Sequence, residues 1–150
     1  RFKKHRFMET TIERVIFLQG IELFRDVPSE QLAHLAGITE NVVFEPGEVL
    51  FRESEPSRSL YLLIEGNVQL TRNGKVRTEI KESEAIGVWG FFDGGDRLMT
   101  ATCTEESHFL KIDRLDFYDL LEERVHLSEE LIKYFVKRIR KLIEASDVVV

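Results

Sequence analysis

Short apolar segments separated by turn dipeptides occupy the middle of the chain and limit the folds that it can adopt. From Asn41 onward, segments rich in Val, Leu, Ile and Phe are interrupted by Pro46-Gly47, Glu65-Gly66, Asn73-Gly74 and Gly94-Gly95. Closely spaced turns of this kind are typical of many short antiparallel strands. Because strands of this length cannot bury both faces alone, we expect an antiparallel β-roll of the jelly-roll type over residues 41–112.

Asn73-Gly74 is the most specific local signal in this part of the chain. Apolar residues alternate on both sides of it, at Val68 and Leu70 before the turn and at Val76 and Ile80 after it. Asn-Gly is the preferred dipeptide of a two-residue type I′ hairpin, in which both turn residues have positive φ. The pattern predicts two paired strands that meet at this dipeptide.

Helical spacing precedes the predicted roll. Apolar residues over 8–24 recur at mostly helical intervals, with Gly20 as the expected break. Pro28-Ser29 opens a second predicted helix, in which Ser29 is the expected N-cap and Gly37 the expected C′ residue. The sequence therefore predicts two helices ahead of the strands.

Helical spacing returns after the roll, over residues 113–123 and 128–145. The predicted fold class is α+β and mainly β, an antiparallel β-roll flanked by N-terminal helices and a long C-terminal helix. We expect one globular domain with these parts: a basic linker or helix start at 1–14, helices at 15–38, the roll at 41–112, helices at 113–145 and a tail at 146–150.

The net charge argues against nucleic acid as a partner. The chain carries 27 acidic and 21 basic residues, a formal charge of −6, whereas nucleic-acid binding needs a basic face. Residues 1–14 and 131–150 each carry a net charge of +3, and residues 15–130 carry −12. We therefore predict an acidic body between two basic ends and no nucleic-acid partner through this chain.

The N-terminal segment allows two interpretations. Its basic residues are interleaved with two phenylalanines: Arg1, Phe2, Lys3, Lys4, His5, Arg6 and Phe7. The segment is either a solvated linker or a contact with an anionic membrane, as on the cytoplasmic side of a transmembrane helix. Because the chain starts at Arg1, we expect a processed product or a domain of a longer protein with an output or membrane domain elsewhere. The single cysteine, Cys103, excludes an internal disulfide and favours a cytoplasmic location.

Motifs for catalysis and metal binding are missing from the sequence. There is no Gly-x-Ser-x-Gly elbow, and Gly74-Lys75 is followed by Val76 rather than the Ser or Thr of a phosphate loop. Most predicted strands lie between residues 34 and 108, where there is no histidine. Each histidine is expected to be an ordinary surface or half-buried residue: His5, His34, His108 and His126. We predict neither an enzyme nor a metal site.

A glycine-rich segment that ends near an isolated arginine is the strongest candidate for a binding site. Residues 87–95 contain four glycines, and Arg97 is the only Lys or Arg between Lys81 and Lys111. Glycines allow backbone N–H groups to form an anion nest, and a guanidinium binds phosphate bidentately. A tight loop with an exposed arginine is the alternative that these residues leave open.

Three segments resemble the cyclic nucleotide-binding domain family, which includes catabolite activator proteins, kinase regulatory subunits and cyclic-nucleotide-gated channels: Phe44–Leu50, Leu60–Val68 and Ile86–Ala101. They stand in the family's order, and the resemblance covers roughly residues 15–145. It implies a β-roll between helices, a phosphate-binding cassette inside the roll and a final helix that responds to ligand. The candidate cassette residues are Gly87, Val88, Trp89, Gly90, Arg97 and Leu98.

The resemblance fails at positions that contact ligand in the family. The family's glutamate, which holds the ribose 2′-hydroxyl, is replaced by Val88, and the small or hydroxyl residue after the cassette arginine is replaced by Leu98. Of the ligand-contacting side chains, only Arg97 is kept. Three aromatic residues of the cassette either pack in the core or line a remodelled pocket: Trp89, Phe91 and Phe92.

The final predicted helix carries an apolar row at 3-4-3 spacing, formed by Ile132, Phe135, Ile139 and Leu142. Such a row either packs on the roll or forms the seam of a homodimer, and the sequence leaves both open. The positions of this helix that contact the base in activator-type family members fall near Leu142 and Ile143.

Two functions follow from the resemblance and its gaps. The first is a non-catalytic regulatory module of the cyclic nucleotide-binding fold within a larger protein, with weak or lost binding of cAMP or cGMP because of Val88. The alternative is a working sensor of cAMP, cGMP or another small anion, with Arg97 as the phosphate anchor and cassette backbone amides as donors.

Overall fold

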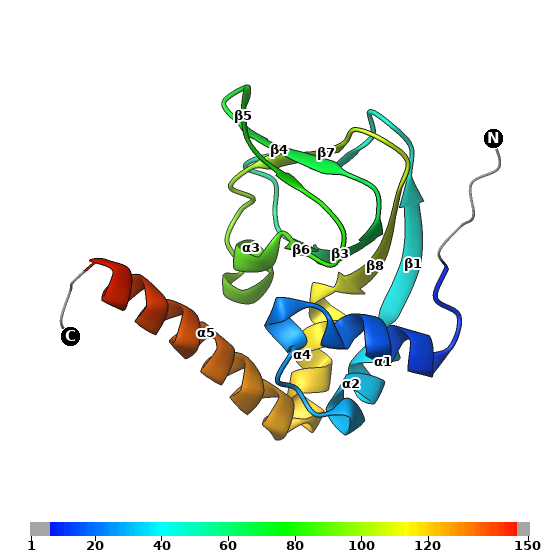
Figure 1. Cartoon of the computed structure of the whole chain (residues 1–150), viewed down its shortest axis with the longest axis vertical. Helices are drawn as coiled ribbons and strands as arrows, with labels where there is room; N and C mark the ends of the chain where they lie inside the picture. Colours follow the sequence, from blue (N-terminus) through cyan, green and yellow to red (C-terminus); the bar gives the residue numbers. More distant parts are fainter. Residues whose placement is uncertain (1–6, 147–150) are drawn as a thin grey trace.

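The computed structural model describes residues 7–146, which form a β-roll above a layer of helices (Figure 1). Two four-stranded antiparallel sheets make the roll, with strand orders β1-β8-β3-β6 and β2-β7-β4-β5. The strands are β1 (Thr39–Phe44), β2 (Val49–Phe51), β3 (Ser59–Glu65), β4 (Val68–Arg72), β5 (Lys75–Ile80), β6 (Ala85–Ile86), β7 (Thr100–Cys103) and β8 (Ser107–Asp113). The predicted antiparallel β-roll with flanking helices is confirmed.

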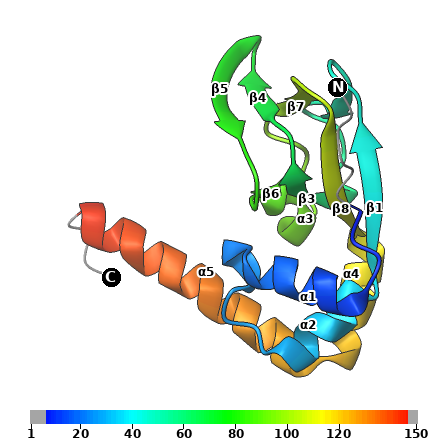
Figure 2. The ribbon, with the colours of Figure 1, turned by 45° about the vertical axis from the view of Figure 1, so that its right-hand side comes forward.

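The helices gather at one end of the roll. In Figures 1 and 2, α1, α2 and α4 pack together below the strands, and α5 runs outward from them on the side of α3. Their bounds are α1 (Thr11–Gln19), the 3₁₀ helix η1 (Glu22–Phe24), α2 (Ser29–Ala36), α3 (Val88–Asp93), α4 (Arg114–Glu123) and α5 (Val125–Ser146). Thr10 starts α1 through a capping box with Glu13, and Gly20 ends it, as predicted for Gly20.

The predictions for both caps of α2 and for the start of α5 are wrong. Pro28 occupies the N-cap position because its carbonyl accepts the N–H of Leu32 at 3.0 Å, which makes Ser29 the first helical residue. Gly37 has φ −66° and closes α2 in the right-handed region, so it is not a left-handed C′ residue. The last helix begins at Val125 rather than at residue 128.

The hairpin predicted at Asn73-Gly74 is confirmed. The two residues have φ values of 53° and 76° and lie between the paired strands β4 and β5. The predicted alternation holds for Val68, which is fully buried, but not for Val76, which is 55% exposed. The register of the pair shifts between Leu70, which is opposite Thr78, and Thr71, which is opposite Val76. This irregularity changes the face of β5 on which Val76 lies.

Strand β3 separates two hydrophobic clusters and is buried on both faces. Leu60, Leu62 and Ile64 belong to the cluster that the roll shares with the helices. Tyr61 and Leu63 belong to the cluster inside the roll. Successive side chains of a strand point to opposite faces, so this one strand joins both parts of the core.

Cys103 and His108 are both buried in the roll. Cys103 lies inside the roll as a free thiol, and burial raises its pKa to about 11. His108 is only 1% exposed, so the prediction of a surface or half-buried residue is wrong there; it sits on β8 between two neighbouring strands. Of the segment predicted as a linker or membrane contact, residues 1–6 lie outside the described residues. Phe7 is described and is 45% exposed, with its ring centre 5.6 Å from that of His108. Within residues 7–146, no helix is long and apolar enough to cross a membrane.

Aromatic rings join α3 to the C-terminal helices. Phe91 is fully buried, with its ring centre 4.9 Å from that of Phe117 on α4. The ring of Phe92 lies 5.0 Å from that of Phe135 on α5. Trp89 stays 54% exposed, although its ring centre is 6.3 Å from that of Phe135. Phe91 therefore belongs to the core and the half-buried Phe92 packs against it, whereas Trp89 does not.

The contact between α3 and α4 gives a test of this packing. We expect Phe117→Ala to lower the free energy of unfolding by about 3 to 5 kcal/mol, because it leaves a cavity in a fully buried position. Leu115→Ala, on the same helix but 71% exposed, should change it by less than about 0.5 kcal/mol. Urea denaturation followed by circular dichroism measures both, and equal effects would contradict the described packing.

Candidate functional site

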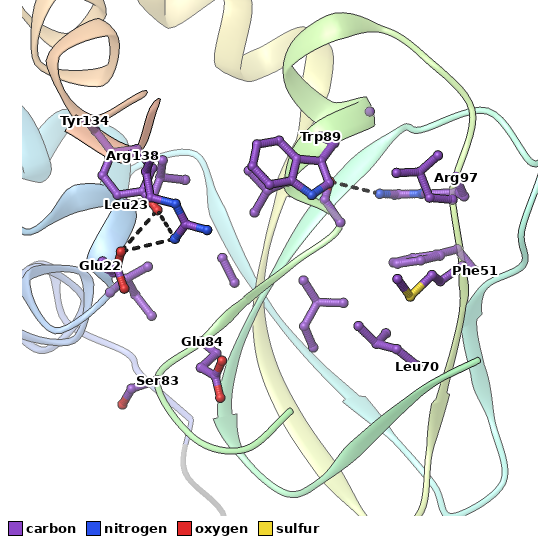
Figure 3. Close-up of a pocket in the computed structure, with 18 of the residues that line it drawn as sticks. Glu22, Leu23, Phe51, Leu70, Ser83, Glu84, Trp89, Arg97, Tyr134 and Arg138 are labelled. Carbon is purple, nitrogen blue, oxygen red and sulfur yellow. Dashed lines mark hydrogen bonds and ion pairs between the residues drawn. The ribbon is translucent and has the colours of Figure 1, made fainter. Parts of the chain in front are cut away.

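A cavity of about 620 Å³ lies between the roll, α3, η1 and α5 (Figure 3). The six cassette residues predicted from the sequence all line it: Gly87, Val88, Trp89, Gly90, Arg97 and Leu98. Val88 is half-buried and packs against the cluster shared with the helices, and Leu98 is 54% exposed. No group of His, Cys, Asp or Glu side chains that could hold a metal ion occurs in the part of the chain that the structure describes.

Two glycines bring α3 close to the strands. Gly87, with φ 87°, turns the chain from β6 into α3, and a Cβ at this position would collide with the guanidinium of Arg97. A Cβ on Gly90 would collide with the hydroxyl of Ser57, which donates a hydrogen bond to the carbonyl of Gly95 at 2.8 Å. The glycines of the cassette are therefore needed for close approach between α3 and the roll.

Arg97 points into the roll and is only 6% exposed, so the alternative of a loop with an exposed arginine is wrong. Its Nη1 donates to the carbonyl of Gly87 at 3.1 Å, and its Nη2 donates to the carbonyl of Ser59 at 2.6 Å. The guanidinium carbon lies 3.9 Å from the centre of the Phe51 ring. Burial lowers the pKa of Arg97 because the charged form loses hydration. Arg97 forms no ion pair with any residue in the described range 7–146.

Side chains of η1 and α5 form the opposite wall, which sequence reasoning missed. Arg138 Nη1 lies 3.2 Å from Glu22 Oε1, and the hydroxyl of Tyr134 donates to the same oxygen at 3.5 Å (Figure 3). Leu142 and Ile143, the expected base-contacting positions, do not line the cavity, because the cavity ends about one turn earlier along α5, at Arg138. The only sequence signal for this wall is the i, i+4 spacing of Tyr134 and Arg138.

Three of the four residues predicted as a dimer seam are exposed, and the fourth, Phe135, is partly covered by α3. Ile132, Ile139 and Leu142 are exposed, at 62%, 55% and 68%. Phe135 is half-buried and turns toward α3, as its contact with Phe92 shows. The exposed row of α5 is therefore formed by the other three residues together with Val136, which is 43% exposed.

Comparison with known proteins identifies the family to which this cavity belongs. Residues 41–124, which hold every strand except the first two residues of β1, match the cyclic nucleotide-binding domain family. The chain belongs to this family. The cyclic nucleotide-binding fold of a regulatory domain thus accounts for the roll, the cassette and the long final helix.

Relatives carry this domain in different contexts. The chain is 29% identical over 139 residues to a CRP-like cAMP-activated global transcriptional regulator of Mycobacterium tuberculosis, covering 89% of this chain and 59% of the regulator. It is 28% identical over 135 residues to the lysophospholipase nte1 of Neurospora crassa, covering 87% of this chain and 9% of that enzyme. The crystal structure of the N-terminal domain of a transcriptional regulator from Streptomyces coelicolor matches with a TM-score of 0.77 and 30% identity, over 86% of this chain and 93% of that domain. The chain thus spans just over half of one curated relative and a tenth of the other.

The close approach of Gly87 to Arg97 yields a prediction with a matched control. Gly87→Ala should lower the free energy of unfolding by about 3 kcal/mol, from left-handed strain and from displacement of Arg97. Gly74→Ala has a similar φ of 76° but no atom within 4 Å of the added Cβ, so it should cost only about 1 kcal/mol. Thermal denaturation compares the two variants. Equal losses would show that Arg97 does not occupy the space beside Gly87.

Proposed function

We propose that this chain is a non-catalytic regulatory module of a larger protein, with a cyclic nucleotide-binding fold that binds cAMP and cGMP weakly or not at all. The observation that carries the proposal is Val88 on the cavity wall, where the family's pattern has the carboxylate that holds the ribose. An isopropyl group accepts no hydrogen bond. A nucleotide in this cavity would therefore leave its 2′-hydroxyl without that acceptor.

The binding free energy that is lost with this hydrogen bond determines how weakly cAMP or cGMP would bind. A hydrogen bond to a charged group contributes about 1.5 to 3 kcal/mol, and a buried hydroxyl without a partner costs about 1 to 3 kcal/mol. Each 1.4 kcal/mol changes affinity about tenfold. The replacement at Val88 alone is thus enough to move a micromolar site toward millimolar affinity.

The surroundings of Arg97 support the same proposal. Both of its terminal nitrogens already donate to backbone carbonyls, of Gly87 and Ser59. A phosphate at this guanidinium would have to replace or share these bonds, which reduces the net gain from the new contact. Leu98 next to it offers no hydroxyl to the phosphate and presents an apolar side chain instead.

A working sensor of cAMP, cGMP or another small anion is the second candidate, and one observation favours it. Arg97 is buried and forms no ion pair among the described residues, and a buried cation gains free energy from a nearby anion. In this case Arg97 anchors the phosphate and backbone amides of the cassette supply further donors.

Calorimetric titration with cAMP and cGMP separates the two functions. For the unmodified chain we expect no saturable binding tighter than about millimolar. Val88→Glu should tighten cAMP binding by at least about tenfold, because it restores the acceptor for the ribose hydroxyl. Val76→Glu adds the same charge on β5, outside the cavity, and should leave binding unchanged.

An Arg97→Ala change made together with Val88→Glu should remove the gain, since the phosphate then has no cation. Saturable micromolar binding to the unmodified chain that is lost in Arg97→Ala would instead establish the working sensor and refute weak binding.

We also propose that α5 joins two copies of the chain in a homodimer. Ile132, Val136 and Ile139 are exposed and follow the 4-3 spacing of a two-stranded coiled coil, so a second α5 would bury them. Ile139→Asp should weaken dimerisation by at least about tenfold, because it buries a charge in the seam. Ile12→Asp makes the same change at an exposed isoleucine of α1 and should leave dimerisation unchanged. Sedimentation velocity measures both variants, and a monomeric unmodified chain removes the proposal.

The context of the module is proposed from its relatives and its composition. The transcriptional regulator and the lysophospholipase named above are both longer than this chain, which supports a covalently attached output or membrane domain. The single, buried cysteine supports a cytoplasmic location, and the basic N-terminal residues support either a linker or a contact with an anionic membrane surface.

A further inference from the structure

Apolar side chains cover most of the cavity wall between Arg97 and α5. In Figure 3, Phe51 and Leu70 lie on the side of the roll, and Trp89 projects from α3 toward the centre. The apolar wall is formed by Phe51, Leu70, Val88, Trp89, Leu98 and Met99. The cavity has a volume of about 620 Å³, which lies within the usual range of small-molecule sites, about 300 to 1,000 Å³. The shape and chemistry of this wall suit an apolar molecule.

Arg97 places a positive charge at one end of that wall, and no carboxylate among the described residues forms an ion pair with it. It is 6% exposed, it forms no ion pair among residues 7–146, and its Nε has no hydrogen-bond partner. A buried charge is costly unless an opposite charge pairs with it. Glu55 attracts Arg97 from a distance, but an anion in the cavity would supply the ion pair that no residue of 7–146 forms with it.

The acidic side chains of the lining do not oppose an anion at this end. Glu22 is held by Arg138 at 3.2 Å on the opposite wall. Glu84 lies away from Arg97, on the side of the cavity near Ser83 (Figure 3). Glu55, which acts on Arg97 through its charge, does not line the cavity. Among the side chains that line this end, Arg97 therefore carries the charge that an anion would meet.

The apolar wall also selects the body of the ligand. Val88 and Leu98 offer no hydrogen-bond acceptor or donor through their side chains, so hydroxyl groups placed against them would lose their water without replacement. A hydrocarbon chain in the same place has no hydrogen bonds to water that it could lose, and its binding removes apolar surface from water. One anionic group followed by hydrocarbon satisfies both parts of the cavity.

We infer that this cavity binds an apolar monocarboxylate, with its carboxylate near Arg97 and its hydrocarbon body against Leu70, Val88 and Leu98. This inference rests on the proposed loss of nucleotide binding and names the ligand class that the same site takes instead. A carboxylate matches the charge and the planar donor geometry of a single guanidinium. A bare anion would leave the apolar wall uncovered.

Trp89 provides a direct reporter of binding. It is the only tryptophan of the chain and it lines the cavity, so its emission responds to a molecule that enters there. We would titrate the unmodified chain with sodium decanoate, with 1-decanol as the uncharged match, and with inorganic phosphate as the bare anion. We expect a saturable response to decanoate that is at least about tenfold tighter than that to decanol, and none to phosphate.

Two variants test the two parts of the site. Arg97→Gln should weaken decanoate binding by at least about tenfold and leave decanol unchanged within about twofold. Leu98→Glu places a carboxylate on the apolar wall and should weaken decanoate binding by a similar factor. Leu98 is 54% exposed, so this variant keeps the test valid even where Arg97→Gln lowers stability. Leu115→Glu, on an exposed position of α4 outside the cavity, is the matched control and should bind like the unmodified chain.

The inference is overturned by any of three results: no saturable response to decanoate, equal affinity for decanoate and decanol, or a response to phosphate as strong as that to decanoate. Titration with cAMP separates this failure from that of the proposed function. A chain that binds neither cAMP nor decanoate refutes the carboxylate site alone, whereas micromolar cAMP binding refutes the proposed function as well.

Discussion

The burial of β3 on both faces is the constraint on which the other parts of the structure depend. Because its side chains fill the core of the roll on one face and the core shared with the helices on the other, neither part can shift without the other. β6 pairs with β3 at Tyr61 and Leu62, so Gly87 follows directly from a strand that β3 holds. The carbonyl of Ser59, at the start of β3, accepts the bond from Arg97. Both ends of the cassette are thus positioned by one strand.

Arg97 has a structural role that any ligand must accommodate. Its two hydrogen bonds and its stacking on Phe51 keep the guanidinium in place without an ion pair to any carboxylate of residues 7–146. The absence of a side chain on Gly87 makes the room for it. A cation held in this way costs hydration that the backbone carbonyls return only in part. The site is therefore rigid in position and still incomplete in charge, which is the state that a preorganised anion site requires.

The local features of the fold could be predicted from the sequence, and the long-range ones could not. Asn73-Gly74 located its hairpin because turn chemistry is a property of two adjacent residues. Arg97 could be singled out because no other cation occurs near it in the chain. The pairing of Glu22 with Arg138 spans 116 residues and exists only after α5 packs beside η1, so no spacing rule predicts it. Phe135 belongs to the same helical stripe as the exposed isoleucines, and only the position of α3 shows that it faces inward.

The contacts that fix α5 to the rest of the domain become weaker toward its C-terminal end. Leu127 and Leu131, near its start, are 0% and 4% exposed and belong to the main core. Phe135 follows, held by ring contacts with α3, and Arg138 beyond it is held by an ion pair whose two side chains are 44% and 55% exposed. An exposed pair of this kind contributes at most about 1 kcal/mol. Moving the part of α5 that borders the cavity therefore costs less free energy than moving its start. A ligand that contacts this wall more favourably in one position of α5 than in another needs only a small difference in binding free energy to shift the helix.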